Sequence, residues 1–197
     1  MTGQTRVPRK ELDGALGAIL KVAMRKMVGG VPQGAEVMWN HPRMFKDSMR
    51  IGRFTEKWDR LDRNLAAFAA MASAAEIGCN FCLDFNYFVA HNKGLDEAKA
   101  REVPRWREST VFTPLERRVM GYAVAMSQTP PTVTDEQSAA LLEDLGADGL
   151  VELTARVAFM NFSARTNVSL GIPSEEYAES CGLAPLATSG DGVPSGA

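Results

Sequence analysis

Two cysteines separated by two residues, Cys79 and Cys82, are the side chains whose types and spacing most clearly indicate chemistry. In the first turn of a helix, such a pair lies within reach of a disulfide bond. The unpaired N–H groups and the positive dipole end of a helix N-terminus also favour thiolate over thiol. A thiolate is a nucleophile, and a neighbouring thiol resolves the sulfenic acid that it forms. The pair therefore indicates a redox-active dithiol.

Two other interpretations of this pair remain open. Two cysteines at this spacing can form half of a zinc site, but the other half should be a second Cys or His pair. Cys181 stands alone, and His41 and His91 are far apart in the sequence. Alternatively, both cysteines are small apolar core residues.

The elements that must position the two thiols are two helices. The first is alanine-rich, runs from about Arg60 to Ile77, and can be capped by Asp59. Gly78 is a natural helix C-terminus. The second helix should start near Cys79 and end before Gly94.

Helical periodicity dominates the rest of the chain, and no convincing alternating strand pattern is present. Two capping boxes, which begin at Thr113 and Thr134, open helices that reach about Ser127 and Leu145. Further helices are predicted over 11–28, 42–58, 96–103 and 149–170, and a loop over 31–42. We therefore predict an all-α protein with a single domain over 1–183 and a disordered tail over 184–197.

Composition excludes several classes of function. The 197 residues include 22 Lys+Arg and 24 Asp+Glu, a net charge of −2, which does not suit a protein whose main partner is nucleic acid or an anionic membrane. The most apolar run, from Leu65 to Ala75, is interrupted by Ser73 and is far shorter than a membrane span. The first residues lack an apolar signal segment. We expect a cytoplasmic protein with no membrane partner.

Several motifs together resemble the carboxymuconolactone decarboxylase/alkylhydroperoxidase D family. They are Trp39–Pro42, Arg53–Leu61, Glu76–Phe85 with the cysteine pair, Thr113–Gly121, and Asn161–Ile172. The resemblance implies a single-domain helical bundle that assembles into homo-oligomers, most often trimers or hexamers. It also implies a peroxidase without a cofactor or metal, in which Cys82 attacks a hydroperoxide, Cys79 resolves, and a dihydrolipoyl group restores the dithiol.

The sequence departs from this family pattern at two members of the proton relay. Asn86 occupies the place of the histidine that follows the second cysteine by one helical turn, and Ala67 occupies the place of a glutamate. Glu76 is the nearest carboxylate that could substitute. Tyr87 is a candidate pocket residue, whereas His91 should point to the opposite face of the helix.

Two other charged residues are expected to have structural roles. Asp84 lies in the first turn of the second helix, points away from Cys82, and can favour the helix dipole. Arg165 shares a helix face with Asn161, and the resemblance suggests that Arg165 has a structural hydrogen-bond role rather than a catalytic one.

Three functions are compatible with these residues. The first is a thiol-dependent peroxidase or dithiol oxidoreductase that acts on small hydroperoxides. The second is a cofactor-free decarboxylase of a lactone or carboxylated ring compound, which would need a placed acid–base pair. The third is a non-catalytic oligomer that keeps the dithiol for structure or redox sensing, and the apolar pair Met38–Trp39 in a predicted loop favours an oligomer.

Overall fold

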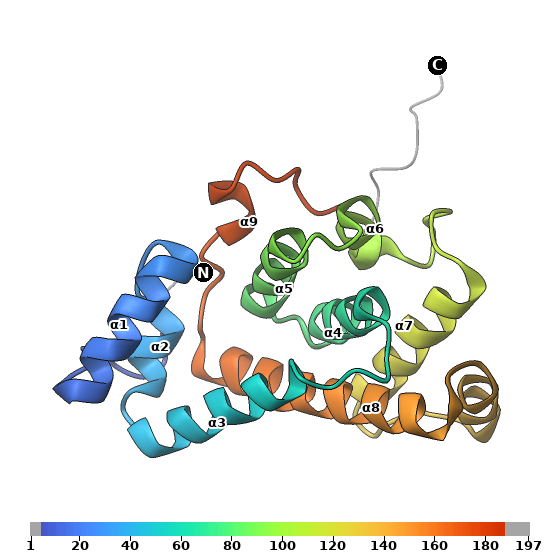
Figure 1. Ribbon diagram of the computed structural model, residues 1–197, viewed down its shortest axis with the longest axis horizontal. Coiled ribbons are helices and arrows are strands. Elements are labelled where there is room, and N and C mark those ends of the chain that lie inside the picture. The colour runs from blue at the N-terminus through green and yellow to red at the C-terminus, as the bar shows by residue number, and fades with distance from the viewer. Residues whose placement is uncertain (1–4, 188–197) are drawn as a thin grey trace.

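The computed structural model describes residues 5–187, and in this part of the chain all regular structure is helical, without a strand (Figure 1). The prediction of an all-α protein is therefore confirmed. The helices are α1 (Gly14–Val28), α2 (Gln33–Met38), α3 (Pro42–Thr55), α4 (Arg63–Ile77), α5 (Asn80–Asn92), α6 (Glu97–Glu102), α7 (Pro114–Ser127), α8 (Asp135–Leu170) and α9 (Tyr177–Ser180), with a 3₁₀ turn at Val103–Arg105 between α6 and α7.

The alanine-rich helix α4 lies at the centre of the bundle and packs against α5, α7 and α8 (Figure 1). Its side chains Ala69, Ala72 and Ala74 are almost completely buried, and so is Ser73. Small side chains allow neighbouring helices to approach closely, which suits a helix enclosed on several sides. This packing places the C-terminal end of α4, next to Cys79, inside the protein.

The start of α4 differs from the sequence prediction. Asp62, and not Asp59, caps the helix, because its Oδ1 accepts the N–H groups of Asn64 and Leu65 at 2.8 and 3.1 Å. The preceding backbone is held by α8, since the N–H of Arg60 donates to a Glu152 carboxylate oxygen at 2.7 Å. A tertiary hydrogen bond therefore delays the helix by three residues.

The two predicted capping boxes are confirmed. Thr113 opens α7 and Thr134 opens α8, each with its reciprocal partner, Glu116 or Gln137. The long helix α8 is broken at Gly146, whose φ of 72° is non-helical. This break lies at the predicted boundary between two separate helices, so the sequence located it correctly.

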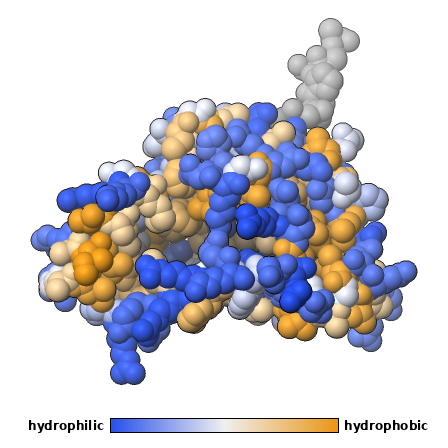
Figure 2. Space-filling view, in the orientation of Figure 1, coloured by the Kyte–Doolittle hydropathy of each residue, from blue (hydrophilic) through white to orange (hydrophobic). Residues whose placement is uncertain are grey.

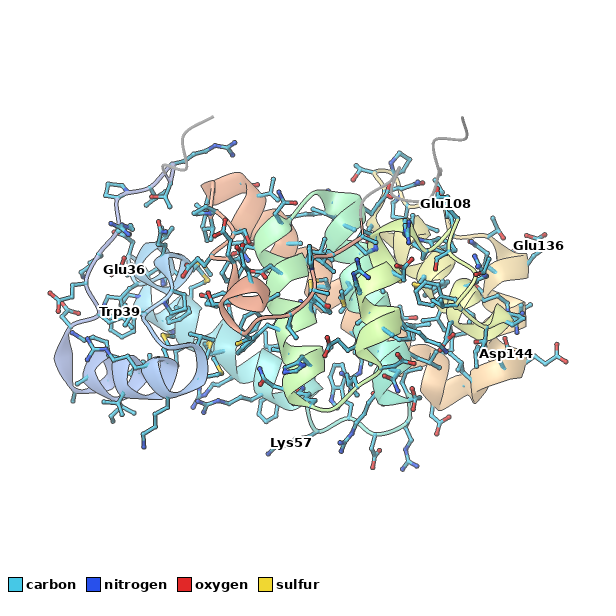
Figure 3. All side chains as sticks on the ribbon, turned by 90° about the horizontal axis from the view of Figure 1, so that it is seen from above. Glu36, Trp39, Lys57, Glu108, Glu136 and Asp144 are labelled. Atoms are coloured by element: carbon cyan, nitrogen blue, oxygen red, sulfur yellow. The ribbon has the colours of Figure 1, made fainter. Side chains whose placement is uncertain are left out.

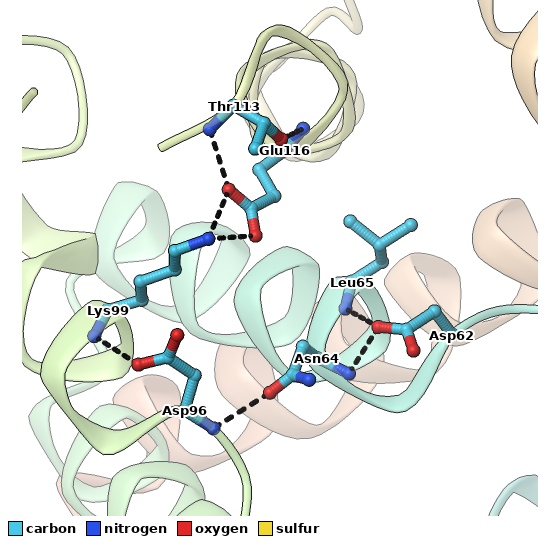
Figure 4. A network of polar contacts seen from close by, with 7 residues as sticks. All are labelled: Asp62, Asn64, Leu65, Asp96, Lys99, Thr113 and Glu116. Carbon is cyan, nitrogen blue, oxygen red and sulfur yellow. Dashed lines mark hydrogen bonds and ion pairs between the residues drawn. The ribbon is translucent and has the colours of Figure 1, made fainter. Parts of the chain in front are cut away.

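A polar network joins the starts of α4 and α7 to α6 (Figure 4). The Asp96 N–H donates to Oδ1 of Asn64 at 2.9 Å, and Lys99 Nζ donates to the Glu116 carboxylate at 2.8 Å. Glu116 also accepts the N–H of Thr113 at 2.7 Å. These contacts fix the connection that follows α5, and so restrain the helix that carries the dithiol.

The segment predicted as a loop over 31–42 contains α2, which was missed because its six residues include no capping signal. Its neighbour Trp39 is buried between α1 and α3, where its ring packs edge-on against Phe45 and its indole N–H donates to Asp13 at 2.8 Å. Figure 3 places Trp39 at one end of the molecule, away from Glu136 and Asp144. Trp39 is therefore a core residue of this chain, so the Met38–Trp39 pair does not support the prediction of an oligomer.

Part of the segment predicted as a disordered tail is held against the bundle. The N–H of Ala187 donates to the Arg101 carbonyl at 3.0 Å, and Leu186 packs against the core. The remainder of that prediction, residues 188–197, lies outside the described residues.

The packing of α4 leads to a prediction about the side-chain size that its central positions tolerate. Replacing Ala69 by Leu adds three carbons where no exposed surface remains, and overpacking should lower the free energy of unfolding by about 1–3 kcal/mol. The control Ala158→Leu, on the exposed side of α8, should change it by less than about 0.5 kcal/mol. Urea unfolding followed by circular dichroism measures both, and equal stability of the two variants would contradict the prediction.

Candidate functional site

Cys79 and Cys82 lie where the chain turns from α4 into α5. Gly78 ends α4 with a φ of 77°, a conformation that a residue with a side chain adopts only with strain. The Cys79 N–H then donates to the Ala74 carbonyl at 2.9 Å, and Cys79 itself caps α5. The predicted placement of the pair at a helix N-terminus is confirmed by this geometry.

Both cysteines are free thiols and both are buried, with 2% and 4% of their surfaces exposed. They form a cysteine cluster, as we call it, with Ala74 on α4 and Ala164 on α8. The partly buried side chains around it are also apolar: Ile77, Phe81, Leu83 and Met160. A reactant must therefore reach the sulfurs through an apolar shell.

Each sulfur accepts one N–H. The backbone N–H of Cys82 donates to Sγ of Cys79 at 3.2 Å, and Nδ2 of Asn167 donates to Sγ of Cys82 at 3.3 Å. Donors that point at sulfur stabilise the thiolate. The site can therefore hold one negative charge shared by the pair.

The two thiols differ in acidity. Hydrogen bonding from the Cys82 side chain lowers the pKa of Cys79, against the effect of burial, and the Cys82 N–H and Asn167 lower it further. The same contact with Cys79 raises the pKa of Cys82, and burial raises it more. These contacts favour a thiolate on Cys79, the residue nearer the helix N-terminus, whereas the resemblance implied Cys82 as the attacking thiol.

The other predicted site residues lie in different environments. Nδ2 of Asn86 donates to the Cys82 carbonyl at 2.7 Å, so this amide serves the backbone of α5. Tyr87 is fully buried in the core, and its hydroxyl donates to the Ala184 carbonyl at 3.1 Å. His91 is partly exposed and contacts Glu97 at 2.6 Å. Within residues 5–187, none of these three side chains forms a hydrogen bond with either sulfur.

Asn167 is the residue that sequence reasoning missed. It belongs to the Asn161–Ile172 motif, but the sequence offered no reason to assign it to the thiols. Its side chain reaches Cys82 from α8, 85 residues later in the chain. The signal available was the motif itself, whose third polar residue had no assigned role.

Asp84 has a role other than the one predicted. It is buried and does not act on its own helix dipole; its carboxylate accepts the N–H groups of Tyr177 and Ala178 at 2.9 and 3.0 Å and the Ser174 hydroxyl at 3.2 Å. It therefore ties the start of α9 to α5, two residues beyond Cys82. Tyr177 completes this contact, since its ring packs against Phe81 and Phe85.

Glu76 lines an open cleft of about 490 Å³ beside the cysteine cluster. The other lining residues are Ile77, Ser127, Gln128, Thr129, Pro130, Thr132 and Arg165. Neither sulfur lines this cleft, but Ile77 lines it and also packs against the cysteine cluster. The cleft therefore adjoins the cysteine cluster at Ile77.

Arg165 forms hydrogen bonds within the fold: its Nε donates to Asn161 Oδ1 at 3.3 Å, and its Nη2 donates to the Ser127 carbonyl. Asn161 in turn donates to the hydroxyls of Ser73 and Ser127, which contact each other at 2.8 Å. This buried network joins α4, α7 and α8.

Two kinds of feature are absent from the part of the chain that the structure describes. No group of three or more His, Cys, Asp and Glu side chains is placed to hold a metal ion. No helix there is long and apolar enough to cross a membrane.

Comparisons of sequence support the resemblance. Residues 44–125 match the model of the carboxymuconolactone decarboxylase family. YnjA, an uncharacterized protein of Escherichia coli strain K12, is 34% identical over 128 residues, which cover 65% of this chain and 70% of YnjA.

Solved structures show the same fold. A cysteine-to-alanine variant of the debrominase Bmp8, in complex with 2,3,4-tribromopyrrole, has a TM-score of 0.76 at 18% identity and covers 88% of this chain and 93% of its own. An uncharacterized peroxidase-related protein from Ralstonia eutropha JMP134, an alkylhydroperoxidase AhpD core, has a TM-score of 0.75 at 18% identity and covers 88% of this chain and 94% of its own. The predicted AhpD-like fold is confirmed.

The hydrogen bond from Asn167 leads to a prediction about thiol acidity. In the unsubstituted protein, Cys79 should be alkylated at lower pH than Cys82, because its pKa is the lower one. Asn167→Ala removes a donor that lowers both pKa values, so the alkylation midpoint should rise by about one pH unit, the equivalent of one hydrogen bond to a charged group. Mass spectrometry of each cysteine across pH measures this.

The matched control is Asn92→Ala, which removes an amide at the far end of α5, where it donates to the Phe88 carbonyl. Its midpoint should equal that of the unsubstituted protein. An unchanged midpoint in Asn167→Ala would show that this contact does not stabilise the thiolate.

Proposed function

Because the chain belongs to the carboxymuconolactone decarboxylase family, we propose that it is a dithiol oxidoreductase that reduces small hydroperoxides through Cys79 and Cys82. One observation carries the proposal: two free thiols meet at the N-terminus of α5, and each sulfur accepts an N–H. Such a pair can hold a thiolate and a proton side by side, which two-electron reduction of a peroxide requires.

The proposed reaction begins with attack of the Cys79 thiolate on the terminal oxygen of the hydroperoxide. The O–O bond breaks, Cys79 becomes a sulfenic acid, and the departing alkoxide takes the proton of the Cys82 thiol to leave as an alcohol. The Cys82 thiolate then attacks the Cys79 sulfur and forms the disulfide, and the hydroxide that leaves takes a proton from solvent. The pair is oxidised by two electrons, and the peroxide is reduced by two.

The assignment of attack to Cys79 differs from the one implied by the resemblance. It is supported by the position of Cys79 at the N-cap of α5, where its Sγ accepts the Cys82 N–H at 3.2 Å, and by the direction in which the contact between the two side chains moves each pKa, down for Cys79 and up for Cys82. Cys82 then becomes the resolving thiol, one helical turn away.

Turnover in this protein should be slower than in an enzyme with a complete proton relay. Asn86 is engaged by the Cys82 carbonyl, and Ala67 has no titratable group. General acid–base assistance is typically worth about 10²–10⁴ in rate. Activation therefore rests on the α5 N-terminus and Asn167.

The surroundings of the sulfurs also favour thiol chemistry over decarboxylation. Apolar side chains pack around the cysteine cluster, and within residues 5–187 Asn167 is the side chain outside the pair that donates a hydrogen bond to a sulfur. A cofactor-free decarboxylase needs a placed acid and base. Glu76, the carboxylate expected to substitute, lies in the neighbouring cleft.

The proposal includes two partners. An external dithiol such as a dihydrolipoyl group would reduce the Cys79–Cys82 disulfide by thiol exchange. A second copy of this chain would cover the apolar surface of α1, where Leu16, Ile19, Val22 and Met27 are exposed (Figure 2). Exposed apolar patches of this kind mark interaction sites.

Single cysteine variants test the reaction. Cys79→Ser should abolish consumption of cumene hydroperoxide in the presence of dihydrolipoamide, because the attacking sulfur is lost. Cys82→Ser should lose turnover but accumulate a sulfenic acid on Cys79, which dimedone traps for mass spectrometry. Cys181→Ser is the control and should keep full activity, because Cys181 is exposed and lies outside the site.

Two outcomes would overturn parts of this proposal. Full activity in Cys79→Ser and Cys82→Ser would remove the peroxidase function. A sulfenic acid on Cys82 in Cys79→Ser, with none on Cys79 in Cys82→Ser, would assign the attack to Cys82.

The exposed face of α1 leads to a separate prediction. At micromolar concentration, multi-angle light scattering should give a mass of at least two chains, each of 21.4 kDa. Ile19→Glu and Val22→Glu together should shift it toward the monomer, because charge opposes burial of that face. A monomer mass for the unsubstituted chain would contradict the proposal.

A further inference from the structure

The cleft beside the cysteine cluster contains a cation and an anion that are not paired with each other. Glu76 comes from the end of α4, Arg165 comes from α8, and residues 127–132 form the wall between them. Within the described range, no ion pair joins either of these two side chains to a residue of opposite charge. Two unneutralised charges in one concave site indicate a ligand with polar groups at both ends.

The Arg165 guanidinium is held by hydrogen bonds to the protein but still has N–H groups that are not used. Its Nε donates to Asn161, and its Nη2 donates to the Ser127 carbonyl. These bonds use two of the five N–H groups of a guanidinium and hold its plane against the buried Ser73–Ser127–Asn161 network. A fixed guanidinium with free donors matches the geometry of a carboxylate.

Glu76 restricts what the rest of the ligand can be. Its carboxylate is exposed, has no hydrogen-bond partner among residues 5–187, and accepts hydrogen bonds only. A second negative group near it would be repelled, whereas an O–H would be accepted. The complementary molecule therefore has a carboxylate at one end and an O–H at the other.

The cleft also has a direct relation to the thiols. Ile77 follows Glu76 in the chain, lines the cleft, and packs against the cysteine cluster. A ligand with its O–H end at Glu76 would therefore lie next to a residue that also packs against the cysteine cluster.

We propose that small carboxylate-bearing hydroperoxides bind first in this cleft, with the carboxylate on Arg165 and the hydroperoxide O–H at Glu76, before they reach the sulfurs. This inference rests on the proposed function for its substrate class. The charge selection itself does not depend on peroxide turnover and can be tested separately.

The test compares two alkylating probes that differ in one group, iodoacetate and iodoacetamide, on the full reduced chain at a single pH. The ratio of their rates at Cys79 and Cys82, obtained by mass spectrometry, measures charge selection, because the thiolate fraction cancels. Exposed Cys181 in the same molecule reports the ratio without the cleft. We expect Arg165→Gln to lower the iodoacetate to iodoacetamide ratio at the dithiol by about tenfold, the loss of one charge-assisted contact, and to leave Cys181 unchanged.

Two further variants serve as an opposite test and a control. Glu76→Gln should raise the same ratio, and because its side chain is exposed and makes no hydrogen bond with residues 5–187, the fold should be retained. Lys57→Gln removes an exposed positive charge that Figure 3 places at the edge of the molecule, and it should leave the ratio unchanged.

The outcomes separate the two proposals. A ratio that does not change in Arg165→Gln and Glu76→Gln, or that changes equally in Lys57→Gln, overturns the anion site. Loss of peroxide consumption with the ratio effect intact would overturn the peroxidase function and leave a carboxylate site beside the dithiol.

Discussion

The structure depends on the close packing of α4, which is enclosed by α5, α7 and α8. That packing requires small side chains at Ala69, Ala72 and Ala74, because a larger residue would separate the helices. It also requires the polar Ser73 to find partners inside the bundle, which Ser127 and Asn161 provide. Since the chain turns directly from α4 into α5, a central α4 places the two thiols in the interior.

Burial has opposite effects on the dithiol. It excludes bulk water and limits indiscriminate oxidation, but it also disfavours the thiolate that reacts. The site counters this cost with N–H donors from the Cys82 backbone and from Asn167. The contact between the two cysteine side chains lowers the pKa of Cys79 and raises that of Cys82. An asymmetric pair of this kind can supply a nucleophile and a proton donor from two identical side chains, as the proposed reaction requires.

The site is also connected to two other parts of the fold. Asp84 holds the start of α9 on α5, so the C-terminal segment is attached near the helical turn that must adjust when a disulfide forms. The network behind Arg165 holds one wall of the cleft, and Ile77 both lines that cleft and packs against the cysteine cluster. The same α4–α7–α8 contacts that stabilise the bundle therefore position the charged groups of the cleft.

The sequence by itself determined the all-α class, the capping boxes at Thr113 and Thr134, the break near Gly146, and the Cys79–Cys82 pair at a helix start, because each depends on residues close together in the chain. It did not reveal α2, the cap at Asp62, the contact of Asn167 with Cys82, or the use of Asp84 by α9. The contacts of Asn167 and Asp84 join residues that are distant in the sequence, and the backbone before Asp62 is held by Glu152 of α8, so these partners are selected by packing. The burial that raises both thiol pKa values and the Asn167 donor that lowers both likewise exist only once α4, α5 and α8 have come together.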